Sequence, residues 1–90
     1  MKKVLMMMLA DCPHCKRANQ MIEELQSENP KYAAIEIQRE DEEKNTALAD
    51  SLDYYYVPCF FVDGEKLMEG VPSKEKIEMV LQAACEKEER

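Results

Sequence analysis

Two cysteines separated by two residues stand out in the stretch Cys12-Pro13-His14-Cys15. Thiols at this spacing carry out one of two kinds of chemistry: they exchange with a disulfide, or they help to bind a metal ion such as zinc. The apolar run before Cys12 also permits a third interpretation, in which it ends a lipoprotein signal and Cys12 carries a lipid. The surrounding residues decide among the three.

The signal interpretation fits the residues before Cys12 poorly. Residues 4–10 supply only seven apolar positions, and Asp11 stands where the cleavage site of a signal needs small residues. We therefore expect a cytoplasmic protein whose resting thiols are reduced.

The composition narrows the class of protein. A chain of 90 residues is expected to form one domain, residues 1–90, around one hydrophobic core. Its formal net charge of −7 argues against a nucleic-acid partner and against an anionic membrane surface. No stretch approaches the roughly 18 apolar residues of a membrane span. We expect a monomer without nucleic-acid or membrane partners.

The apolar pattern indicates an α/β fold. Residues 2–10 begin with two lysines and are apolar from there on, which is typical of a strand buried on both faces. Residues 13–28 have the spacing of an amphipathic helix, and Pro13 suits its first turn. The further expected elements are a strand over 31–38, a helix over 41–52 with an acidic first turn, a hairpin over 59–70 that turns at Asp63-Gly64, and a helix capped by Ser73.

These elements follow the order β-α-β-α-β-β-α. The first βαβ unit predicts two parallel strands with a right-handed crossover, and the hairpin adds an antiparallel pair. The sequence therefore predicts a mixed four-stranded sheet flanked by three helices.

The two cysteines fall at different positions on this map. Cys12 lies where the first strand ends and the helix begins, and the unpaired N–H groups and the dipole of the helix there favour its thiolate. Cys15 lies one turn further, on the stripe that faces the core. One exposed and one shielded sulfur suit a two-step exchange, in which Cys12 attacks a substrate disulfide and Cys15 resolves the mixed disulfide. An imidazole at His14 can donate a hydrogen bond or a charge to the Cys12 thiolate, which would make the disulfide more oxidising.

Three motifs together resemble the thioredoxin superfamily. They are the Cys-Pro-His-Cys dithiol, the segment VPCFFVDGE at 57–65 and the segment EGVPSKEKIEMVL at 69–81. In size and element order the chain is most similar to glutaredoxin-like proteins, so the resemblance implies a minimal thioredoxin fold. It also implies that Pro58 is cis beside the cysteine pair, and that the backbone of Val57 pairs with an extended substrate. We place Pro13 and Gly70 with them among the substrate-binding residues.

The expected function is thiol–disulfide oxidoreduction on protein or small-molecule disulfides. It needs no resident cofactor, and either glutathione or a reductase would supply the electrons. Two alternatives stay open: metal or iron–sulfur cluster binding through Cys12, and a non-catalytic interaction module of thioredoxin type. Zinc would want four ligands, for which Cys12, His14, Cys15 and Cys59 form a nominal set. We interpret Cys59 first as a small residue of a strand.

Overall fold

The computed structural model describes residues 2–85. The elements in chain order are β1 (Val4–Met8), α1 (Pro13–Glu28), α2 (Pro30–Ala33), β2 (Ile37–Asp41), α3 (Thr46–Ser51), β3 (Cys59–Val62), β4 (Glu65–Glu69) and α4 (Lys74–Cys85). The predicted order is confirmed, with the one-turn helix α2 as an addition. No helix within residues 2–85 is long and apolar enough to cross a membrane.

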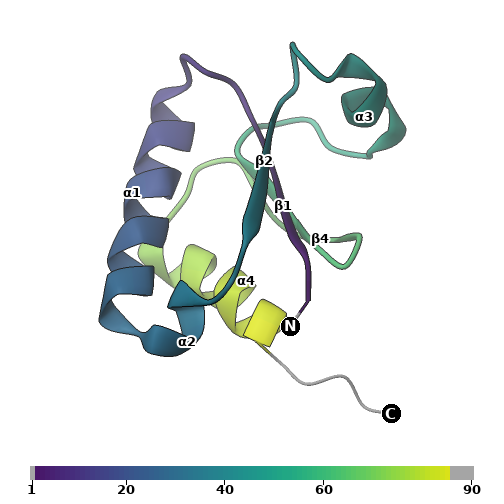
Figure 1. The fold of residues 1–90 in the computed structure, drawn as a ribbon. Helices are drawn as coiled ribbons and strands as arrows, with labels where there is room; N and C mark the ends of the chain where they lie inside the picture. The colour runs from purple at the N-terminus through teal and green to yellow at the C-terminus, as the bar shows by residue number, and fades with distance from the viewer. Residues whose placement is uncertain (1, 86–90) are drawn as a thin grey trace.

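The four strands form one mixed sheet in the order β2-β1-β3-β4 (Figure 1). β1 pairs in parallel with β2 and antiparallel with β3, and β3 pairs antiparallel with β4. The parallel pair and the antiparallel hairpin are those that the sequence predicts. β1 is a central strand, so its carboxyl end lies in the middle of one end of the sheet, between the ends of β2 and β3.

Helices cover the two faces of this sheet unequally. Side chains of β1 alternate between them, so Met6 packs in a large core cluster while Met7 packs in a small one. The large cluster joins the sheet to α1, α2 and α4, and the small cluster joins it to α3, which lies alone on its side (Figure 1). Both Met6 and Met7 are fully buried, which confirms a strand with no solvent-exposed face.

The second strand begins later than the sequence pattern predicts. Residues 31–38 were expected to be extended, but residues 30–33 form α2 and the strand runs over Ile37–Asp41. Asn29 caps α2 by accepting a hydrogen bond from the N–H of Lys31 at 3.0 Å. The Gln26 amide donates to the carbonyls of Tyr32 and Ile35, which occupies backbone acceptors that a strand would otherwise offer.

The helix α3 is shorter than the helix predicted over 41–52, and the prediction that its first turn is acidic is wrong. Asp41 ends β2 and then forms a turn, since its carboxylate accepts from the N–H of Glu43 at 2.8 Å. Such a local side-chain bond competes with helix formation. The helix starts only after Asn45, whose side chain accepts from the N–H of Leu48 at 3.3 Å.

The two remaining turn signals are confirmed. Asp63 and Gly64 both have positive φ, at 50° and 86°, as a tight hairpin turn requires. Ser73 caps α4: its hydroxyl oxygen accepts from the N–H of Lys76 at 3.2 Å. These caps and turns set the ends of the elements that carry the cysteine pair and the segment beside it.

Candidate active site

Cys12 lies at the junction of β1 and α1, in the N-cap position of the helix. Its backbone is extended, and Pro13 then occupies the first turn. The Cys12 sulfur accepts a hydrogen bond from the N–H of Cys15 at 3.2 Å. Because N–H groups in the first turn of a helix lack partners within the helix, they stabilise negative charge on an atom placed there. The geometry thus suits a thiolate at Cys12.

The second sulfur is shielded. Cys15 is 1% exposed and belongs to the large core cluster. Burial first, and then the hydrogen bond with the Cys12 side chain, raise the pKa of the Cys15 thiol to about 12. Cys12 itself is half-buried rather than exposed, because it packs against the rim of the same cluster. The predicted inequality between the two sulfurs is therefore present, with a smaller contrast in exposure.

His14 does not make the contact that its position suggests. Its Nδ1 lies 2.6 Å from a guanidinium nitrogen of Arg17, one turn further along α1. A guanidinium only donates hydrogen bonds, so Nδ1 is the acceptor and Nε2 carries the proton of the neutral ring. The hydrogen bond that the structure gives His14 thus goes to Arg17 and not to the Cys12 sulfur. The i, i+3 spacing of the two residues was the available sequence signal for this pair.

The Val57–Pro58 segment lies beside the cysteine pair. The peptide bond between these two residues is cis, as the family resemblance implied. β3 begins directly after it, and Cys59 pairs with Met7 near the carboxyl end of β1. The register therefore brings Val57 and Pro58 to the end of the sheet where β1 ends and Cys12 follows. Pro58 is buried, whereas Val57 is half-buried and packs against both core clusters.

Gly70 is joined to this segment by a backbone hydrogen bond. It follows β4, and its N–H donates to the carbonyl of Pro58 at 2.9 Å. Its φ of 92° is strained for any residue with a side chain, which explains a glycine here. Of the predicted substrate-binding residues, Val57, Pro58 and Gly70 form one contiguous group. Pro13 is exposed at the start of α1, next to Cys12.

Sequence reasoning missed Glu69. Its carboxylate accepts hydrogen bonds from the backbone N–H groups of Tyr55 and Tyr56, the latter at 2.9 Å, and from the ammonium of Lys66 at 2.9 Å. The hydrogen bond from Tyr55, then those from Lys66 and Tyr56, lower the pKa of Glu69 to about 2. A single glutamate at the end of a strand gives no sequence signal for such contacts.

The nominal zinc ligands are not gathered in one place. Cys59 is fully buried in the small core cluster with Met7 and Phe61, on the sheet face opposite Cys15. Burial raises its pKa to about 12. In the part of the chain that the structure describes, no three His, Cys, Asp or Glu residues are arranged to hold a metal ion. The placement of Cys59 agrees with its interpretation as a small residue of a strand.

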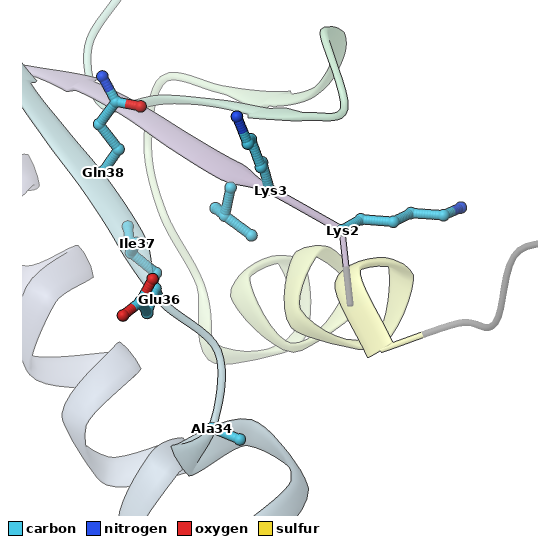
Figure 2. Close-up of a pocket in the computed structure, with 7 residues that line it drawn as sticks. Lys2, Lys3, Ala34, Glu36, Ile37 and Gln38 are labelled. Atoms are coloured by element: carbon cyan, nitrogen blue, oxygen red, sulfur yellow. The ribbon is translucent and has the colours of Figure 1, made fainter.

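A hollow of about 630 Å³ lies at the opposite end of the sheet from the cysteines. Figure 2 shows it at the start of β1, with Ala34 and residues 36–38 along one side. The long polar side chains of Lys2, Lys3 and Glu36 point in different directions there rather than toward a common centre (Figure 2). This arrangement does not form a second site that competes with the cysteine pair.

A mixed four-stranded sheet with a dithiol at a helix start and a cis-proline beside it defines the thioredoxin class of folds. The sequence model of the thioredoxin domain matches residues 2–82, and the chain belongs to that family. The predicted minimal thioredoxin fold is confirmed. A comparison with curated proteins gave no significant match.

Two solved structures show the same fold. One is thioredoxin from Malassezia sympodialis (Mala s 13), which is 18% identical over 94% of this chain and 76% of that protein, with a TM-score of 0.71. The other is described as a malarial protein and is 18% identical over 93% of this chain and 97% of that one, with a TM-score of 0.70. At this level of identity the likeness concerns the fold.

Proposed function

We propose that this protein is a dithiol oxidoreductase that reduces or exchanges disulfides in proteins or small thiols. One observation carries the proposal: the Cys12 sulfur sits at the N-terminus of α1 and accepts the Cys15 N–H, while the Cys15 sulfur is buried behind it. Membership of the thioredoxin family supports a redox role in general.

The reaction divides between the two sulfurs. The Cys12 thiolate attacks one sulfur of the substrate disulfide, forms a mixed disulfide and releases the other substrate sulfur as a thiolate, which takes up a proton. Cys15 then loses its proton and attacks the Cys12 sulfur, which releases the second substrate thiolate and leaves a Cys12–Cys15 disulfide; the released thiolate takes up one proton, so the proton count balances. Two electrons pass from the dithiol to the substrate. The raised pKa of Cys15 keeps it protonated during the first step, so the initial attack falls to Cys12.

The segment beside the dithiol positions the substrate. Gly70 already occupies the carbonyl of Pro58, so the neighbouring backbone of Val57 is the part that pairs with an extended substrate. We further propose that the protein acts as a cytoplasmic monomer without a resident cofactor. Glutathione or a reductase returns the two electrons.

Brief alkylation with iodoacetamide at pH 6, followed by peptide mass spectrometry, tests the assignment of the nucleophile. Cys12 should be labelled first because only its sulfur is both accessible and placed at a helix N-terminus. Earlier labelling of Cys15 or Cys59 would contradict the assignment.

A redox titration in glutathione buffers then tests the dithiol switch itself. A single two-electron transition of the Cys12–Cys15 pair is expected. A midpoint potential of about −200 mV would indicate a glutaredoxin-type protein, and one of about −270 mV a thioredoxin-type protein. If the pair forms no disulfide at any ratio of thiol to disulfide, the proposed function is wrong.

A further inference from the structure

The edge strand β4 contains one more residue than its partner requires. Phe60 pairs with Met68 and the next residue, Phe61, pairs with Lys66, so Leu67 has no partner on β3. This is a β-bulge, which shifts the alternation of side chains along the strand by one position. Bulges of this kind often re-aim a side chain next to a functional site.

The bulge places Lys66 and Glu69 on the same face of the sheet. In a regular strand, residues three apart point to opposite faces, and these two would not meet. Here Lys66 is paired with Phe61 and Glu69 with Cys59, both of which face α3. Both charges act on the nearby Cys59 thiol, whose pKa Glu69 raises and Lys66 lowers.

Glu69, once turned to this face, reaches the loop before the cis-proline. Its oxygen Oε2 accepts the N–H groups of both Tyr55 and Tyr56. These two tyrosine residues are 82% and 68% exposed, so packing in the core does little to hold this part of the loop. The hydrogen bonds to Glu69 therefore hold the backbone directly before Val57.

We propose that Glu69 is a positioning residue that holds the 55–56 backbone so that Val57 is presented to an extended peptide substrate. The inference rests on the proposed function and assigns a further residue to it. The hydrogen bonds of Glu69 go to Tyr55, Tyr56 and Lys66 and not to the sulfur of Cys12 or Cys15. Glu69 therefore acts on the docking of a peptide and not on the reactivity of Cys12. Its low pKa keeps the carboxylate ionised at every pH at which the protein would work.

The contribution of Lys66 is the smaller one. Its ammonium is bonded to the other carboxylate oxygen, Oε1, and its side chain is about a third exposed. Exposed ion pairs contribute little, whereas a carboxylate shared by two backbone N–H groups makes charge-assisted hydrogen bonds. Lys66→Met should consequently resemble the wild type, Glu69→Gln should have an intermediate effect, and Glu69→Ala the largest.

Two disulfide probes separate docking from sulfur chemistry. Insulin offers peptide backbone on either side of its disulfides, whereas 5,5′-dithiobis(2-nitrobenzoate) has no backbone to pair with Val57. For Glu69→Ala we expect KM for insulin to rise about tenfold with kcat within about twofold, and an unchanged rate with the small probe. Amide hydrogen exchange at Tyr55 and Tyr56 should be faster in this variant, which gives a readout independent of activity.

The possible results distinguish the positioning role of Glu69 from the proposed oxidoreductase function. An unchanged KM for insulin in Glu69→Ala, or an equal loss of rate with both probes, would overturn the positioning role while leaving the oxidoreductase intact. A Lys66→Met variant as impaired as Glu69→Ala would also overturn it, because the ion pair and not the backbone bonds would then hold the loop. A wild-type protein that reduces neither probe would refute the proposed function and the positioning role with it.

Discussion

Two buried thiols lie on opposite faces of one sheet and share the same acidity. Cys15 packs under α1 and Cys59 under α3, and burial raises the pKa of each to about 12. Their neighbours differ: Cys15 is hydrogen-bonded to a second sulfur, whereas Cys59 is surrounded by Met7 and Phe61. Two thiols of similar acidity thus differ in their surroundings, because only Cys15 has a second sulfur within hydrogen-bond distance, as the proposed exchange requires.

The largest expected effect separates the dithiol from Cys59. Cys12→Ala should lower the rate of disulfide reduction by roughly three orders of magnitude, because it removes the proposed nucleophile. Cys59→Ala should stay within about twofold of the wild type, since its sulfur is fully buried on the far face. The turnover of insulin with a chemical reductant measures both. A comparable loss in Cys59→Ala would break the distinction between the two thiols.

Unfolding at alkaline pH should show that Cys15 and Cys59 make similar contributions to the pH dependence of stability. Because the folded-state pKa of each is raised, their contribution to stability is complete below about pH 9 and is lost as the pH rises toward 12. The free energy of unfolding should fall by up to roughly 1.4 kcal/mol per pH unit for each thiol. Urea unfolding of the reduced protein between pH 8 and pH 10 measures this slope.

Cys59→Ala and Cys15→Ala should each remove about half of the thiol-dependent slope. Oxidation of the Cys12–Cys15 pair should match Cys15→Ala, because a disulfide has no proton to lose. A slope that neither substitution changes would show that the two sulfurs are not the groups whose ionisation destabilises the fold.

The smallest effect concerns His14. If its imidazole favours the reduced dithiol, His14→Tyr should make the disulfide less oxidising by about threefold to tenfold in the exchange constant, which is about 15–30 mV. Arg17→Met should shift the potential in the same direction by a smaller amount, since Arg17 orients the ring through Nδ1. Redox titrations of the wild type, His14→Tyr and Arg17→Met in glutathione buffers measure the three potentials. An unchanged potential in His14→Tyr would make His14 a surface residue without a redox role.

Local signals carried most of what the sequence could predict. Pro13 and the apolar spacing behind it mark the start of α1, and Asp63-Gly64 marks the hairpin, so the positions of Cys12 and β3 follow. The cis bond before Pro58 came from the family resemblance, because an X-Pro pair alone permits either isomer.

The differences arose where individual side-chain hydrogen bonds, and not the apolar pattern, set the ends of an element. The alternation around Ile35 and Ile37 suits a strand, yet Gln26 on α1 binds the carbonyls of Tyr32 and Ile35 and delays its start. Glu69 was missed because its orientation depends on a bulge, and an alternating pattern contains no mark of the extra residue.

The same bulge has a consequence for how copies of the protein meet one another. β4 is an edge strand, and an uninterrupted edge invites another chain to add itself as a fifth strand. The unpaired Leu67 breaks the even spacing of backbone donors and acceptors along that edge, which discourages such addition. At the opposite edge β2 carries the charged residues Arg39, Glu40 and Asp41, which also disfavour it. Each border of the sheet thus carries a feature that disfavours strand-to-strand pairing between copies of the protein.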